Sequence, residues 1–410
     1  MTLPTSAPGD CASPWRTPQG WSRTAALGAG AEAPAGAPPP GPATGAGTGT
    51  GAETDGGAAP RTADDFPAAQ LNCLHHCLRD VLRGHRVVAA TDQLVQPVGT
   101  VFSTDRTFRP WLASPGEQWL TVPQFFGSVR ARWHTAWSVD DLRGLVHDEV
   151  GRGHVPVLHA HRWHVPWLSA TDLLPADYHT MMALGCDGRA LLLADRQPTS
   201  TDPVPREHKV RWDDLADTAR HGVQVLAYDI GETAVGHGDR HDIDLRALLN
   251  LSCRNLSGRA PRVPGMEHGL AAVELLKSFT SPHAAAMLDS KLLRLALRWH
   301  LPSCIDKYVV GNRRLFLHFA RRHRYLHPQA LSTALCRRVE ESATAWAALA
   351  RSLARSARRD GMAEPGVGSA LADVSDAEHR LLAAMTTARD RLRDTPPPAR
   401  PPTRDTVEAR

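Results

Sequence analysis

Cys73 is the residue of this chain best placed to act as a nucleophile. Before it lies Pro/Gly/Ala-rich sequence; after it come apolar residues at helical spacing, namely Leu74, Leu78, Val81 and Leu82. Asn72 is a good helix N-cap and Gly84 a good stop, so the sequence predicts a helix with Cys73 in its first turn. Unpaired backbone N–H groups and the helix dipole favour an anion there, and we expect a depressed thiol pKa. The alternative is a buried structural thiol.

A cysteine nucleophile also needs a base, a group that orients the base, and donors for the oxyanion. His179 opens a predicted strand and Asp195 ends the next one, with the hairpin signal Asp187-Gly188 between them. A hairpin brings these two strand ends together, so we predict His179 as the base and Asp195 as its orienting group. Gln70 is a candidate oxyanion donor through its side-chain amide. A surface histidine and an ordinary turn aspartate are the alternatives.

Metal binding is the main competing use of these residue types. Two cysteines and two histidines share the predicted helix, several of them on one face: Cys73, His75, His76 and Cys77. No second Cys/His pair follows at close spacing, so the zinc signature is weak and we predict no bound metal. Further along, Pro156 favours an edge position for the strand over 155–161. Period two puts His159 and His161 on one face of that strand, and His164 follows at its exit; these histidines line a pocket or face solvent.

The elements around these residues divide the chain into two folded parts. Residues 1–62 are low-complexity and expected to be disordered, and 396–410 form a loose tail. Over 63–235, one helix is followed by a second one capped at Ser138 and by several strands, which is an α+β pattern. Over 240–395 the spacing is helical, with a last helix opened by the capping box Ser375 to Glu378. The other helices are expected around 270–276, 287–297, 312–324 and 328–359.

Composition excludes several classes of protein. The 410 residues suffice for two domains, and seven scattered cysteines fit a reducing cytoplasm better than a disulfide framework. No apolar run is long enough for a membrane span, no signal-peptide pattern opens the chain, and the Arg-rich helices lack the features of a nucleic-acid reader. Residues 240–394 hold 25 Lys and Arg against 15 Asp and Glu, a formal charge of +10, whereas the rest carries −6. We expect this basic half to dock an acidic partner, a solvated helical surface being the alternative.

Several short motifs, spaced along about three quarters of the chain, resemble those of the butirosin biosynthesis protein H family. They are Gln70-x-x-Cys73 opening a helix, Pro156-Val-Leu158, Val165-Pro-Trp-Leu168, His179-x5-Gly185-x-Asp187-Gly188 and Ala194-Asp195. The helical portion over 268–392 is similar to the partner domain that follows in that family. Two positions depart from it: His159-Ala-His161 stands where members usually have an Asp, and Asp195-Arg196 replaces Asp-Pro.

The resemblance implies a papain-like domain, distantly related to the double-glycine leader peptidases of bacteriocin export, followed by an all-α domain. It also implies transfer of an acyl group from a carrier-protein thioester to an amine of an aminoglycoside. On this chain Cys73 would be the nucleophile, His179 the base, Asp195 the orienting group and Gln70 the weaker oxyanion candidate.

We therefore expect a cytoplasmic acyltransferase of natural-product biosynthesis with no bound cofactor. Its acyl donor would be the phosphopantetheine arm of an acyl carrier protein, its acceptor a small-molecule amine, and neither nucleic acid nor membrane would be a partner. Two alternatives remain: a papain-like cysteine peptidase or amidase with the same triad, and a non-catalytic binding protein on the same fold.

Overall fold

The computed structural model describes most of the two parts expected to fold. The predicted tails, 1–62 and 396–410, lie outside the described residues, as does the helix expected over 287–297. The described residues are 71–87, 91–104, 110–113, 129–168, 178–195, 206–230, 244–259, 266–280, 301–356 and 365–394.

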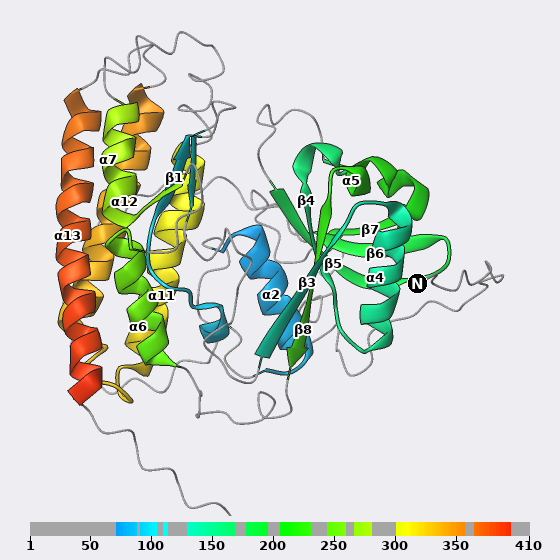
Figure 1. Cartoon of the computed structure of the whole chain (residues 1–410), viewed down its shortest axis with the longest axis horizontal. Helices are drawn as coiled ribbons and strands as arrows, with labels where there is room; N and C mark the ends of the chain where they lie inside the picture. The colour runs from blue at the N-terminus through cyan, green and yellow to red at the C-terminus, as the bar shows by residue number, and fades with distance from the viewer. Residues whose placement is uncertain are drawn as a thin grey trace, which may run out of the picture.

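Six strands form the larger of two sheets in the described part of the chain, in the order β3-β8-β4-β5-β6-β7 (Figure 1). Each neighbouring pair runs antiparallel, and helices accompany the sheet, so the prediction of a mixed α+β protein is confirmed. The strands are β3 (Val129–Ala136), β4 (Val157–His161), β5 (Tyr178–Cys186), β6 (Ala190–Asp195), β7 (Arg206–Arg211) and β8 (Val223–Ile230).

Two helices cover opposite faces of this sheet (Figure 1). Helix α2 (Cys73–Gly84) packs its apolar residues on one face, and α4 (Val139–Gly151) packs on the other. Successive residues of a strand point to opposite faces, and β4 follows this rule: Val157 belongs to the core beside α2, whereas Leu158 belongs to the core beside α4. The sheet is therefore buried on both sides, and α2 is fixed against its centre.

Two helix caps and one turn form as the sequence predicts. The side chain of Asn72 caps α2 by accepting the N–H of His75 at 2.8 Å, and Ser138 caps α4 in the same way. Between β5 and β6, the Asp187 carboxylate accepts the backbone N–H groups of residues 189 and 190 at 2.7 and 2.6 Å, which closes the predicted hairpin.

Strand β4 is not the edge strand that Pro156 indicated. It pairs with β8 on one side and β5 on the other, so it lies inside the sheet. The strand begins at Val157, one residue after the proline, and the Pro156 carbonyl still accepts the N–H of Ala183 at 2.8 Å. A proline just before a strand removes no donor from the ladder, and the edge prediction was wrong for that reason.

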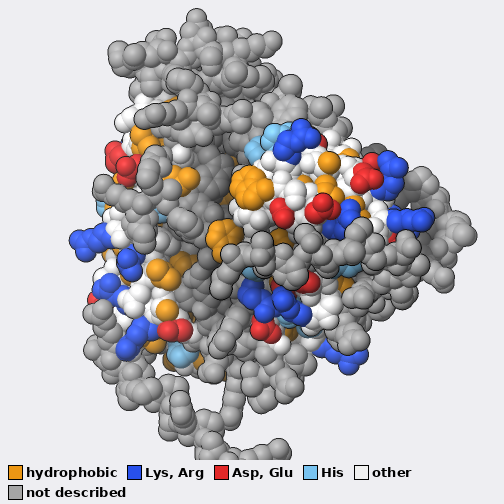
Figure 2. Space-filling view, turned by 45° about the vertical axis from the view of Figure 1, so that its right-hand side comes forward, with side chains coloured by type: hydrophobic (Ala, Val, Ile, Leu, Met, Phe, Trp, Pro, Cys, Tyr) orange, Lys and Arg blue, Asp and Glu red, His pale blue; other side chains and the backbone are white. Residues whose placement is uncertain are grey.

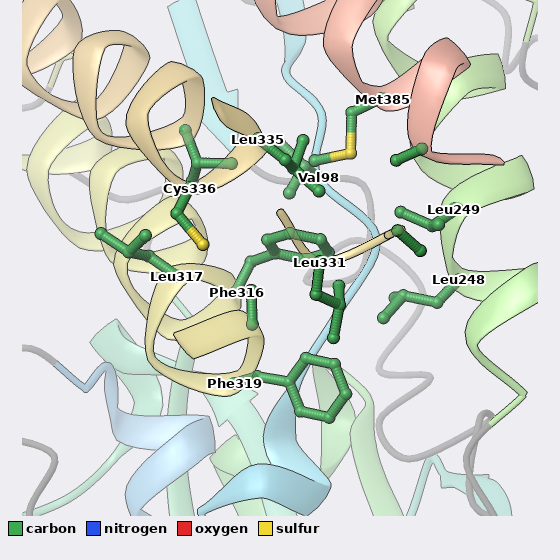
Figure 3. Packing of buried hydrophobic residues seen from close by; sticks show 14 of the residues in the cluster. Val98, Leu248, Leu249, Phe316, Leu317, Phe319, Leu331, Leu335, Cys336 and Met385 are labelled. Carbon is green, nitrogen blue, oxygen red and sulfur yellow. The ribbon is translucent and has the colours of Figure 1, made fainter. Parts of the chain in front are cut away.

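Helices dominate the second half, as predicted. Figure 3 shows one of its cores, formed by helices α6 (Leu245–Leu256), α11 (Gly311–His323) and α13 (Pro365–Asp394). Phe316 and Phe319 of α11 pack there with Leu248 of α6 and Met385 of α13. The prediction over 328–359 began too early, because α12 starts only at Thr333. The helices are α6 (Leu245–Leu256), α7 (Gly269–Phe279), α10 (Leu301–Cys304), a π-helical stretch (Ile305–Val310), α11 (Gly311–His323), α12 (Thr333–Ser356) and α13 (Pro365–Asp394).

The last helix does not begin at Ser375. Helix α13 already starts at Pro365 and runs through the Ser375-to-Glu378 pattern without a break. Instead of capping a helix, the Glu378 side chain is buried and accepts two hydrogen bonds from Arg313 of α11, at 2.8 and 2.9 Å. The capping-box prediction was wrong because a Ser-x-x-Glu pattern also occurs inside a helix, where the glutamate can pair elsewhere.

Residues 95–104 and 110–113, which we placed with the first domain, lie with the second half, whereas Leu94 just before them packs in the core beside α2. A small sheet in the order β2-β1-β9 joins β1 (Val101–Thr104) and β2 (Pro110–Ala113) to β9 (Met266–His268). Phe102 of β1 is buried in a helical core together with Trp346 of α12. The segment after α2 therefore crosses from one half to the other. Among the described residues, no helix has the length and apolar composition needed to cross a membrane.

Candidate active site

Cys73 is the first residue of α2, as the sequence predicts. The apolar face of α2 packs in the core shared with β4, β5 and β8, and the Cys77 thiol lies 3.5 Å from the carbonyl oxygen of Thr180 in β5. These contacts hold the first turn of the helix over the beginning of β5. The Cys73 side chain is buried there, with 8% of its surface exposed.

His179 and Asp195 lie together at one end of the β5–β6 hairpin. The Nε2 atom of His179 is 2.6 Å from Oδ1 of Asp195, and both side chains are buried. The other side of the imidazole is hydrogen-bonded to the Cys73 side chain. Because Nε2 is taken by the carboxylate, Nδ1 is the ring nitrogen left to face the thiol. The three side chains predicted from the sequence therefore meet in the fold.

The electrostatics of this group favour a charged imidazole. Burial by itself lowers the pKa of His179, but hydrogen bonds to Asp195 and Cys73, together with the charges of both groups, raise the pKa from 6.5 to about 9. Burial raises the pKa of the Asp195 carboxyl, but the hydrogen bond and charge of His179 hold that pKa below its usual value. An imidazolium between a carboxylate and a thiol stabilises a thiolate, which is the reactive form of cysteine.

Trp167 completes the surroundings of Asp195, and the sequence did not mark it as functional. Its indole Nε1–H donates to Oδ2 of Asp195 at 2.8 Å, so the carboxylate receives one hydrogen bond on each oxygen. The His208 ring stacks on the indole, with centroids 4.5 Å apart and planes 14° apart. Trp167 holds the carboxylate in place for His179. Its only signal in the sequence was the motif Val165-Pro-Trp-Leu168 of the family resemblance.

Thr180 links Cys73 to the first histidine of β4. The Thr180 hydroxyl oxygen is 3.6 Å from Sγ of Cys73 and 2.9 Å from Nδ1 of His159. Burial, and then the nearby His179 and His161, lower the pKa of His159 to about 3, so this ring is neutral. The sequence left open whether the β4 histidines line a pocket or face solvent. His159 faces the site through its contact with Thr180. Thr180 itself had no signal in the sequence.

The remaining site predictions fall in three places. Gln70 lies outside the described residues. On α2, burial lowers the pKa of His75 to about 4, and within the described residues the Cys and His side chains of this helix do not converge into a three-ligand group. Among the described residues, the one group of three potential metal ligands contains His164 and no cysteine.

No protein-family model matches the chain, and no curated protein matches its sequence significantly. The fold and the site together describe an α+β protein with a buried Cys-His-Asp arrangement at the start of a helix.

The raised pKa of His179 predicts a pH titration that can be followed directly. We expect the ring to keep its proton through neutral pH and to lose it near pH 9, whereas Asp195→Asn should shift that midpoint to lower pH because it removes the neighbouring negative charge. Exchange of the histidine C2 hydrogen, measured by peptide mass spectrometry across pH, reports this midpoint. An ordinary midpoint near 6.5 in the unmodified protein, or no shift in Asp195→Asn, would contradict the site.

Proposed function

We propose that this protein is a cysteine-dependent acyltransferase in which Cys73 is the nucleophile, His179 transfers protons and Asp195 orients His179. The observation that carries this proposal is the buried imidazole held 2.6 Å from Asp195 on one side and hydrogen-bonded to a helix-N-terminal cysteine on the other. A nucleophile, a base and an orienting group in contact are the requirements of covalent acyl transfer. We also propose a papain-like fold for the unit formed by α2, α4 and the six-stranded sheet.

In the first half-reaction, the Cys73 thiolate attacks the carbonyl carbon of a thioester and forms a tetrahedral oxyanion. We expect free backbone N–H groups in the first turn of α2 to stabilise the negative charge, with Gln70 as a further candidate donor. The intermediate collapses by breaking the bond to the donor sulfur, which takes the proton from His179 and leaves as a thiol. The acyl group remains on Cys73 as a new thioester.

In the second half-reaction, an amine attacks the acyl-enzyme. His179, now neutral, accepts the proton that the nitrogen loses, and collapse expels the Cys73 thiolate and releases an amide. The net change is thioester plus amine to amide plus thiol, so no oxidant, metal or bound cofactor is required. Two separate half-reactions predict ping-pong kinetics.

The burial of the site limits the access of bulk water to an acyl-enzyme. Cys73, His179 and Asp195 are all buried, and a thioester intermediate survives longer where water is excluded. The choice of a carrier-protein thioester as donor and a small-molecule amine as acceptor rests on the sequence motifs. A peptidase or amidase would use the same three side chains with water as acceptor.

Charge on the second half supports an acidic donor protein. Figure 2 shows Lys and Arg side chains on the helical half as well as on the first half, mixed with Asp and Glu. On α12 and α13 three arginines surround a single carboxylate: Arg337, Arg338 and Arg380 lie 3.7, 2.7 and 3.8 Å from Glu341. One glutamate leaves a surplus of positive charge in this group. We propose it as part of the docking surface for an acyl carrier protein.

A transfer assay with and without amine distinguishes acyl transfer from hydrolysis. We expect release of the carrier thiol to be fast when both an acyl carrier thioester and a panel of amines are present, and about tenfold slower or more without any amine. The Michaelis constant for the carrier should rise with salt. The Debye length is about 10 Å at 0.1 M salt and shorter at higher salt, so added salt weakens the attraction between exposed charges. Equal rates with and without amine would favour the hydrolase. A Michaelis constant that does not change with salt would contradict the proposed docking surface.

A further inference from the structure

Three potential metal ligands meet on the surface of the first half, away from the cysteine. His164 ends the short turn Arg162–His164 that follows β4, Asp217 lies in α5 (Ala216–Arg220), and His221 caps the C-terminus of α5. Their ligand atoms all lie within 4.8 Å of one another. Asp217 and His221 are four residues apart, the spacing that puts two side chains on one face of a helical turn.

The contacts within this group hold the three side chains beside one another. Nδ1 of His164 is 2.6 Å from one oxygen of Asp217, and Nε2 of His221 is 3.8 Å from the other. The two imidazoles stack, with centroids 3.5 Å apart and planes 8° apart. Imidazole nitrogens beside a carboxylate oxygen form a donor set that suits a transition-metal ion.

The backbone that carries these ligands is held in place independently of any ion. The Thr218 hydroxyl donates to the carbonyl oxygen of His164, which ties the turn after β4 to α5. The N–H of His221 donates to the carbonyl oxygen of Thr218 at 3.3 Å. Both ligand-bearing segments are therefore fixed to each other through one residue, and only side-chain torsions remain to be set when an ion binds.

We propose that His164, Asp217 and His221 form a binding site for a divalent transition-metal ion, with Zn²⁺ as the best match. Two imidazoles and one carboxylate satisfy three of the four positions that zinc prefers, and a water would complete a tetrahedron. The side chains of His164, Asp217 and His221 expose 24%, 60% and 45% of their surface, so an ion can reach them. To direct its lone pair at the ion, His221 turns out of the stack, and its exposure leaves room for that rotation.

Calorimetric titration of the untagged full-length protein with ZnCl₂ tests this site. We expect saturable binding that weakens by about tenfold or more in Asp217→Asn and in His221→Gln, because each removes one ligand of three. His134→Gln is the matched control: this exposed histidine of β3 is not in the group, and its loss should leave the affinity unchanged. Both ligand variants alter exposed side chains, so their circular dichroism should match that of the unmodified protein.

Titration with CoCl₂ identifies the ligands. Binding at the proposed site gives visible absorption without the near-ultraviolet charge-transfer band of a thiolate ligand, and the absorption is lost in His221→Gln. A thiolate band that persists in His221→Gln would place the metal on cysteines and overturn the proposal. Equal zinc affinities in the unmodified protein and the three variants would also contradict the metal site, and the group would then be a His–Asp ion pair.

Discussion

Replacing Cys73 by alanine should lower the rate of acyl transfer by about 10⁴-fold or more, since loss of the nucleophile of a catalytic triad leaves only binding and oxyanion stabilisation. The side chain is small and lies in the first turn of α2, so the helix cap at Asn72 and the apolar packing of α2 persist in the variant. Stability should therefore change little while activity disappears. A loss of this size with an intact fold is the expected signature of a nucleophile.

Cys186→Ala provides the matched control for that experiment. Cys186 ends β5, the strand that carries His179, and its sulfur lies 3.5 Å from Nδ1 of His147, outside the candidate site. It is buried like Cys73, so both substitutions remove one buried sulfur. Transfer rates are compared at saturating donor and amine. A Cys73→Ala protein that transfers the acyl group as fast as Cys186→Ala would rule out the covalent route.

Replacing Glu378 by alanine should lower the free energy of unfolding by about 3–5 kcal/mol, because it leaves a buried guanidinium without its counter-charge. Arg313 and Glu378 are both almost fully buried and joined by two hydrogen bonds of 2.8 and 2.9 Å. The guanidinium also donates to the carbonyl of Gly99 at 3.2 Å and to the Thr100 hydroxyl at 3.0 Å. One ion pair thus connects α11, α13 and the segment that leads into β1.

Urea denaturation of matched variants measures this effect. Glu340 of α12 pairs with Arg321 at 2.9 Å, but both side chains are 56% exposed, so Glu340→Ala should cost at most about 1 kcal/mol. The double variant Arg313→Met/Glu378→Leu should be more stable than Glu378→Ala alone, because no buried charge is left unpaired. Similar losses for Glu378→Ala and Glu340→Ala would contradict the structural role of the buried pair.

Local signals in the sequence predict the parts of the fold that hold the candidate site. The cap at Asn72 and the apolar spacing after it define α2, and Asp187-Gly188 defines the β5–β6 hairpin; both form as expected. The turn places β5 and β6 side by side, but the contact between His179 and Asp195 also depends on the register shift between Ala183 and Gly185, which the sequence did not predict. Each of these predictions depends on residues close together along the chain.

Features that depend on distant parts of the chain could not be predicted in this way. Trp167 reaches Asp195 across 28 positions, and Thr180 reaches Cys73 across 107. The two edge strands had no usable pattern either: β7 is mostly polar and exposed, as an edge strand tolerates. Glu378 looked like part of a helix cap because its partner, Arg313, lies 65 positions away.

The intact mass of the protein after mixing with acyl carrier thioesters, measured beside Cys73→Ala, tests the proposed chemistry most directly. We expect the unmodified protein to gain the mass of one acyl group, to lose it when an amine is added, and Cys73→Ala to gain nothing. An adduct of equal yield on both proteins, or none on either with every donor while iodoacetamide modifies Cys73 no faster than a free thiol, would contradict a Cys73 acyl-enzyme.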